Sequence, residues 1–324
     1  MCLIPDLPFT TLRSTPNRAL FLSEQLRKKG RLAPPGGLAT PLKHEPKLTL
    51  NNDMIIPQLA FGLYKVPATV EGEDIILNAI RAGYRHFDGA AFYQNERTLG
   101  RALRRSGLPR QAFCITSKVW NDAVKEGRDA VKASVQKTLN DINFGDYLDI
   151  CFVHWPVPGH FVEAYKALEE EHKNGSIRSL GLSNFSVEEY QELVDGEIEV
   201  SPVCNQMEVS PVMYRAPLVN FFMENNIAVC ASKALNRAAV LDNPTIVQVA
   251  NAHEVTPAQV MLRWGLQKGL IVATKTSSLS RMEENRNTQQ FVLTETEMSQ
   301  MDQLTTPQAL IDREKLEVTR KTSL

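Results

Sequence analysis

The sequence lacks both of the glycine-rich signatures by which nucleotide-binding proteins are most often recognised. Neither G-x-G-x-x-G nor G-x-x-x-x-G-K-[ST] occurs in the 324 residues, which excludes a Rossmann fingerprint and a P-loop. The five cysteines are scattered and form no C-x-x-C pair or zinc ligand set, which favours a reducing compartment. His253 and Glu254 begin a metalloprotease-like pattern, but no second histidine follows at the required spacing. We therefore expect no metal site.

A large net charge and long apolar runs are also missing. The formal net charge is −1, so there is no basic field to attract nucleic acid. No apolar run approaches the roughly 18 residues of a membrane-spanning helix. A hydrophobic content of 43% and a charged content of 23% are ordinary for a globular protein with a sizeable core. We expect a cytoplasmic protein without nucleic-acid or membrane partners.

The first 46 residues differ in composition from the rest. They contain seven prolines, and residues 1–47 carry eight basic against three acidic side chains. Two interpretations stay open. The segment is either a flexible, poorly structured extension or an organelle transit peptide, because transit peptides are rich in arginine and poor in acids.

From residue 48 onward the pattern is regular. The segment 49–55, with Asn51, Asn52 and Asp53 at its centre, indicates a β-hairpin. Strand-like runs then alternate with helical patterns, and such alternation predicts a parallel sheet. The expected strands are 59–62, 86–88, 113–117, 148–154, 178–182, 203–207, 228–231 and 270–273, and the expected helices are 71–82, 96–106, 128–139, 162–174, 187–193, 217–225 and 257–267. Eight such strands predict an α/β fold of the (β/α)8 TIM-barrel type, with residues 1–46 as the extension and residues 47–324 as the barrel.

Four polar residues in the first half of the chain form a chemical set: Asp88, Tyr93, Lys118 and His154. A phenol has an ordinary pKa of about 10, too high for an acid working at neutral pH. A nearby ammonium lowers that pKa, and a carboxylate holds the ammonium in place. An imidazole can then orient a carbonyl whose oxygen is protonated. The set indicates a reductase site.

The predicted fold brings these residues together. Asp88, Lys118 and His154 each fall at or near the carboxyl end of an expected strand, as do Ser183-Asn184 and Gln206. Active sites of TIM barrels lie on that face. Taken singly, an aspartate or a lysine is usually a solvated surface charge. The shared placement of these residues at the carboxyl ends of the strands favours a role in an active site.

The motifs carry a family resemblance. They are GYRHFDGAAFYQNE at 83–96, TSKVW at 116–120, FVHWP at 152–156, GLSNF at 181–185, NQME at 205–208 and KT at 275–276, followed by Arg281 and Asn285. In this order, over residues 47–304, the chain resembles aldo-keto reductases. The segment 155–165 is similar to the compact members related to diketogluconate reductases. The resemblance implies an NADPH-dependent oxidoreductase that acts on the CH-OH group of donors, takes a small-molecule aldehyde or ketone, and works as a monomer.

The resemblance also assigns roles. Tyr93 would donate the proton, tuned by Lys118 and Asp88, with His154 orienting the carbonyl. The pocket wall would contain Tyr64, Trp120 and Trp155. Residues matching the family's NADP(H) contacts are Ser183, Asn184, Gln206, Ser232, Lys233, Leu235, Lys275, Thr276, Arg281, Glu284 and Asn285. The cations Lys275 and Arg281 suit a 2′-phosphate, which favours NADP(H) over NAD.

Two departures qualify these expectations. At 232–236 the chain has SKALN where the family usually has YSPLG. The aromatic platform under the nicotinamide is therefore missing, with Lys233 available to reach the diphosphate instead. The tail after 304 has no aromatic residue, so we expect a short surface helix or a disordered tail and a wider pocket. The alternative function is a catalytically weak cofactor-binding or regulatory module of the same fold.

Overall fold

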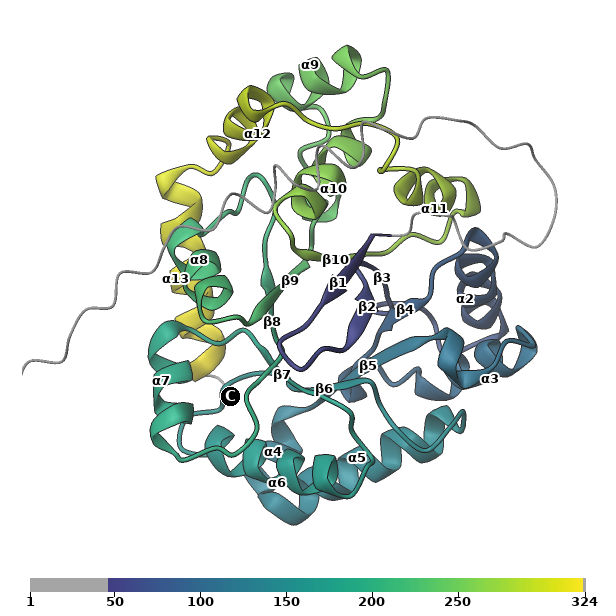
Figure 1. Cartoon of the computed structure of the whole chain (residues 1–324), viewed down its shortest axis with the longest axis vertical. Helices are drawn as coiled ribbons and strands as arrows, with labels where there is room; N and C mark the ends of the chain where they lie inside the picture. The colour runs from purple at the N-terminus through teal and green to yellow at the C-terminus, as the bar shows by residue number, and fades with distance from the viewer. Residues whose placement is uncertain (1–45, 323–324) are drawn as a thin grey trace, which may run out of the picture. The chain divides into compact units, whose positions relative to one another are not determined.

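The computed structural model describes residues 46–322, and its centre is a closed barrel of parallel strands (Figure 1). The order around the barrel is β10-β3-β4-β5-β6-β7-β8-β9. The strands are β3 (Leu59–Gly62), β4 (His86–Asp88), β5 (Cys114–Val119), β6 (Ile150–Val153), β7 (Leu180–Ser183), β8 (Cys204–Glu208), β9 (Ala228–Ser232) and β10 (Ile271–Thr274). The predicted TIM barrel is confirmed.

An antiparallel hairpin closes one end of this barrel. Its strands are β1 (Lys47–Thr49) and β2 (Ile55–Pro57). The Asn51 side chain donates to the carbonyl of Pro202 at 2.9 Å, and the Asn52 side chain donates to Ser179 Oγ at 2.8 Å. Both acceptors lie just before the strands β8 and β7, so the hairpin covers the amino ends of the strands. The opposite face stays open for a site.

Helices surround the strands (Figure 1). Their starts are encoded locally: Thr69 accepts from the amide of Gly72, and Ser186 and Glu189 form a capping box, which satisfies amides that have no partner inside the helix. The helices are α2 (Val70–Ala82), α3 (Glu96–Arg105), α4 (Asn121–Glu126), α5 (Arg128–Ile142), α6 (Phe161–Lys173), α7 (Val187–Asp195), α8 (Ala216–Glu224), α9 (Pro244–Ala252), α10 (Pro257–Gln267), α11 (Leu279–Arg286), α12 (Glu295–Asp302) and α13 (Pro307–Thr322), with short 3₁₀ turns η1 (Ala91–Tyr93), η2 (Arg110–Ala112) and η3 (Asn236–Ala238).

Apolar side chains fill two layers. One cluster lies between strands and helices and includes Phe61 and Trp264, which are at most 1% exposed. A smaller cluster includes Phe152, Cys204 and Cys230 together with hairpin residues. Burial of each large side chain contributes about 1.5–3 kcal/mol to the stability of the fold. The packed barrel therefore holds the residues at its open end in fixed positions. In residues 46–322 no helix is both long and apolar enough to cross a bilayer.

Some expected boundaries were wrong. The strand expected at 148–154 begins at Ile150, because Asp149 turns its carboxylate to the amide of Ile115 and to Arg110. The strand expected at 113–117 runs on to Val119, which puts Lys118 inside the strand. Four helices were missed: α4, α9, α11 and α12. The expectations for residues 1–45 lie outside the described residues.

The tail forms a helix, which is one of the two expected alternatives, but this helix is neither short nor wholly at the surface. Residues 307–322 form the helix α13, and Arg313 on it is only 4% exposed. It is therefore neither disordered nor only a surface helix.

Candidate active site

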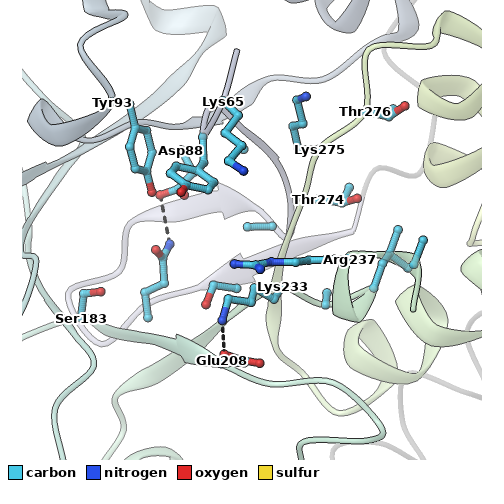
Figure 2. Close-up of a pocket in the computed structure, with 18 of the residues that line it drawn as sticks. Lys65, Asp88, Tyr93, Ser183, Glu208, Lys233, Arg237, Thr274, Lys275 and Thr276 are labelled. Atoms are coloured by element: carbon cyan, nitrogen blue, oxygen red, sulfur yellow. Dashed lines mark hydrogen bonds and ion pairs between the residues drawn. The ribbon is translucent and has the colours of Figure 1, made fainter. Parts of the chain in front are cut away.

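A cavity of about 880 Å³ opens at the carboxyl ends of the barrel strands (Figure 2). Residues from segments 62–65, 88–93, 120, 154–155, 183–184, 206–208, 232–241 and 273–285 line it, together with Ala258 and two arginines of α13. Every predicted site residue except Lys118 lines this cavity. Segments that lie far apart in the sequence thus converge, as the positions of the strand ends predict.

Lys118 lies beneath the cavity floor as part of a buried ion pair. Its ammonium donates to Asp88 Oδ1 at 2.7 Å and to the carbonyl of Gly89 at 2.6 Å. The exposed fractions of the two charged side chains are 0% and 8%. Burial acts to lower the pKa of Lys118, but the charge of Asp88 raises it above its ordinary value. The lysine is therefore a fixed, permanently charged group.

Tyr93 ends the 3₁₀ turn η1, which follows β4 directly. The loop is fixed by Asn95, whose buried amide donates to the carbonyls of Leu63 at 2.9 Å and Val66 at 2.8 Å. The ammonium of Lys118 lies 5.3 Å from the centroid of the Tyr93 ring. Burial raises the pKa of Tyr93, and the charge of Lys118 opposes that rise. The phenol stays protonated at neutral pH beside a cation that can stabilise its anion.

His154 follows β6 and is 9% exposed. Its ring centroid lies 6.1 Å from that of Tyr93 and 4.9 Å from that of Trp120. Burial, and then the charge of Lys118, hold the pKa of His154 well below its ordinary value. Its Nδ1 is buried without a hydrogen-bond partner among the described residues. The imidazole is therefore neutral and able to hydrogen-bond a ligand without bringing a positive charge.

The predicted carboxamide contacts lie next to this set. Asn184 has a positive φ of 63° and its side-chain amide donates to the carbonyl of His154 at 3.1 Å and to Ser183 Oγ at 3.0 Å. Gln206 donates to Asp88 Oδ1 at 3.0 Å and to Cys230 Sγ at 3.3 Å. The bond from Gln206 to Asp88 was not predicted from the sequence. It connects the expected cofactor residues to the buried ion pair.

The segment after β9 has an unusual backbone. Lys233, Asn236, Arg237 and Ala238 all have positive φ, a conformation that side chains other than glycine rarely adopt and that often accompanies ligand contact. Lys233 forms an ion pair with Glu208 at the end of β8. A contact of Lys233 with a diphosphate stays a prediction, and it would require Lys233 to leave or share this ion pair. Ser232 and Leu235 line the cavity beside it.

The end of β10 carries the residues predicted for the cofactor's phosphate. Lys275, Thr276 and Arg281 line the cavity, and Arg281 lies in the first turn of α11. Glu284 accepts from Thr256 Oγ1 at 2.7 Å, and Asn285 donates to Thr274 Oγ1 at 3.5 Å.

These cations leave room for an anion. Within residues 46–322, Lys275, Arg281 and Arg237 make no ion pair, and Figure 2 shows Arg237 extended into the cavity. Cations without an ion pair among the described residues fit a ligand that carries a phosphate and a diphosphate. The donor set therefore fits NADP(H).

The predicted pocket wall is aromatic. Tyr64 lies 5.2 Å from Tyr93 between ring centroids, and Trp120 stacks on Phe92 at 4.0 Å. Trp155, directly after His154, is 8% exposed. Phe92 was not predicted as a wall residue, although it immediately precedes Tyr93.

Several charged residues of the cavity were also missed: Lys65, Glu208, Arg237, Arg313 and Arg320. Glu208 could have been found, because it lies two positions after Gln206 in a strand and so points to the same side. Arg313 and Arg320 are two helical turns apart, which places them on one helix face. No local pattern indicated that this face meets the cavity.

Comparison with known proteins identifies the family. The sequence model of the Aldo/keto reductase family matches residues 59–306. A 9,11-endoperoxide prostaglandin H2 reductase of Trypanosoma cruzi (strain CL Brener) is 35% identical over 260 residues, 79% of this chain and 90% of that protein. Methylglyoxal reductase DkgA of Escherichia coli (strain K12) is 35% identical over 261 residues, 79% of this chain and 92% of that protein.

A solved structure agrees with these sequence matches. The crystal structure of a Gox0644 mutant in complex with NADPH has a TM-score of 0.78 to this chain at 31% identity, over 82% of this chain and 96% of that one. The chain belongs to the aldo/keto reductase family, of the compact type that includes DkgA, and is an NADP-dependent oxidoreductase.

Proposed function

We propose that this enzyme reduces an aldehyde or ketone to an alcohol with NADPH as the reductant and Tyr93 as the proton donor. The observation that carries the proposal is the cavity wall formed by the Tyr93 phenol and the neutral His154 imidazole, above the buried Lys118–Asp88 pair. The aromatic side chains beside them supply an apolar wall for the rest of the substrate.

The proposed chemistry assigns one task to each group. The carbonyl oxygen accepts hydrogen bonds from Tyr93 and from His154, which fixes its position. Tyr93 gives up its proton as negative charge develops on that oxygen. Lys118 then stabilises the remaining phenolate, and Asp88 keeps the lysine in place. His154 stays neutral, so it orients the oxygen without competing as an acid.

The cofactor residues support the same assignment. Ser183, Asn184 and Gln206 would hold the carboxamide end, and Lys275, Thr276 and Arg281 the 2′-phosphate of the adenosine. Ser232, Lys233, Leu235, Glu284 and Asn285 would line the path between these ends and the adenine. When bound, NADPH supplies the hydride that reduces the carbonyl carbon.

The substrate range is proposed from the relatives and the cavity. One relative is named for methylglyoxal and one for a prostaglandin endoperoxide. A cavity of about 880 Å³ with aromatic walls accepts small dicarbonyl compounds and larger aromatic aldehydes. The monomer that the resemblance implies is kept as a proposal for the working unit.

The experiment is a substrate panel. NADPH oxidation would be followed at the dihydronicotinamide absorbance band with methylglyoxal, glyoxal, aromatic aldehydes, ketoses and diketones, and each assay repeated with NADH. We expect turnover of several aldehydes with a clear preference for NADPH. Tight binding of NADPH without turnover of any carbonyl would contradict the proposal and favour a cofactor-binding module.

A further inference from the structure

Both amide protons of Gln206 are used in hydrogen bonds inside the protein. Its Nε2 donates to Asp88 Oδ1 at 3.0 Å and to Cys230 Sγ at 3.3 Å. An amide nitrogen has only these two protons to donate. The amide cannot be turned over, because Asp88, the ion-pair partner of Lys118, would then face the amide oxygen with an acceptor. The orientation of the Gln206 amide is therefore fixed by its partners.

The oxygen of the same amide is left for a ligand. Gln206 lines the cavity, and among residues 46–322 no group donates to its Oε1. This oxygen is nevertheless not sealed inside the protein as an unpaired polar atom. A ligand group that meets Gln206 must therefore be a hydrogen-bond donor.

Cys230 is a fixed acceptor on the neighbouring strand. Gln206 and Cys230 are direct partners in the parallel register of β8 and β9, so their side chains lie on the same side of the sheet. Cys230 is 3% exposed and belongs to the smaller apolar cluster. Cys204 lies on its other side: burial, and then a hydrogen bond with the Cys230 side chain, raise the pKa of the Cys204 thiol well above its ordinary value. The sulfur of Cys230 is thus held between Cys204 and Gln206.

The two acceptors hold Gln206 from different sides of the barrel. Asp88 ends β4, which lies opposite β8 in the barrel order, whereas Cys230 lies on β9, next to β8. The last torsion of a glutamine side chain is soft, so one bond alone leaves the amide plane free to turn. The second bond, to Cys230, fixes that plane.

We propose that Cys230 is a positioning residue for the cofactor, whose sulfur fixes the Gln206 amide so that Oε1 accepts from the carboxamide NH₂ of NADPH. The inference rests on the assignment of Gln206 to the carboxamide under the proposed function. Cys230 acts only through Gln206. Because the oxygen is already in place, no side-chain ordering opposes this bond when the cofactor binds.

The test compares NADPH with its reduced 3-acetylpyridine analogue, in which a methyl group replaces the NH₂. Dissociation constants would be measured by quenching of tryptophan fluorescence, without a carbonyl substrate. We expect wild type to bind NADPH about three- to tenfold more tightly than the analogue, the worth of one neutral hydrogen bond. In Cys230→Val, which removes the acceptor, this ratio should fall toward one through weaker binding of NADPH.

Cys230→Ser separates positioning from packing. The serine hydroxyl still accepts a hydrogen bond, so most of the ratio should remain. A role in packing alone predicts the reverse order, because serine puts a polar group into an apolar cluster and valine does not. Cys230→Ala removes the same acceptor without a branched side chain, and it replaces Cys230→Val if urea denaturation shows that the valine variant is unfolded.

The matched control is Cys114→Val, which makes the same change at another buried cysteine of the same cluster, on β5. It should leave both dissociation constants unchanged. In a Gln206→Met background, Cys230→Val should have no further effect on the ratio, because the residue through which Cys230 acts is gone.

Three results would contradict the inference. If Cys230→Val and Cys230→Ala keep the wild-type ratio, Cys230 does not position Gln206, although the assignment of Gln206 to the carboxamide stands. If both variants bind NADPH and the analogue more weakly by the same factor, Cys230 serves the packing of the barrel. A wild-type ratio near one would instead overturn the assignment of Gln206 itself. Turnover in the substrate panel decides the reductase function separately.

Discussion

Removal of the charge of either Lys118 or Asp88 should lower the free energy of unfolding strongly. Removal of both charges together should lower it by far less than the sum of the two single losses. The two charges are 2.7 Å apart and nearly inaccessible to water. At an effective dielectric constant of about 20, unit charges at that distance attract by about 6 kcal/mol. Desolvation offsets much of this attraction, but a single partner left alone in the interior typically costs about 3–5 kcal/mol.

A double-mutant cycle tests this with wild type, Lys118→Met, Asp88→Asn and the double variant. An asparagine at position 88 can still accept through its oxygen from Thr116 and Gln206, which both donate to Asp88 Oδ1. Each single variant should therefore lower the free energy of unfolding by about 3–5 kcal/mol, mainly through the uncompensated charge of the other partner. The double variant leaves no such charge, so we expect a coupling energy of about 3 kcal/mol.

Urea denaturation with linear extrapolation gives the four free energies of unfolding. If the two single losses of unfolding free energy add up to the loss of the double variant within about 0.5 kcal/mol, the scatter of independent sites, the two charges are not coupled. A loss of less than about 1 kcal/mol in the free energy of unfolding of Lys118→Met would also contradict the prediction, because the Asp88 carboxylate would then need no buried counter-charge.

Three further predictions follow from single positions. Burial raises the pKa of Glu96 to about 7, so its stabilising contribution is present below about pH 4.5 and is lost as the pH rises through 7. Between pH 5 and pH 8, the free energy of unfolding of Glu96→Gln should rise relative to that of wild type by up to about 3 kcal/mol. Parallel curves of unfolding free energy against pH, measured in urea, would refute this. Arg281→Met should raise the KM for NADPH about ten- to a hundredfold and leave that for NADH unchanged; equal losses for both cofactors in steady-state kinetics would place the arginine elsewhere. Ser232→Tyr should restore an aromatic platform and tighten NADPH binding about three- to tenfold by fluorescence titration, and unchanged or weaker binding would show that the cavity cannot accept a stacked ring there.

The barrel and the placement of the catalytic set could be predicted because both depend on local patterns. Short apolar runs alternating with helical segments predict parallel strands, and Asp88 and His154 lie where two of these strands end. The motif order then supplied the expected cofactor contacts. The cavity lining agrees with that list, although the role of each residue stays a proposal.

The remainder depends on tertiary contacts that leave no local signal. Gln206 donates to Asp88 across 118 positions of sequence, and Arg313 contacts Glu208 across 105. The helices α11 and α12 are short and polar, so their periodicity was weak. The helix α13 is longer, but it was underestimated because its buried side chain is an arginine, Arg313, whose partners are the carboxylates Glu208 and Glu317.

The central claim is that the Tyr93 phenol donates the proton to a carbonyl oxygen, and Tyr93→Phe tests it most directly. The change removes one oxygen and keeps the ring, so NADPH binding by fluorescence should stay near that of wild type. We predict that kcat/KM for the best aldehyde of the panel falls about 10²- to 10⁴-fold, the usual contribution of a positioned general acid. Turnover near the wild-type rate in a variant that binds NADPH normally would contradict the account.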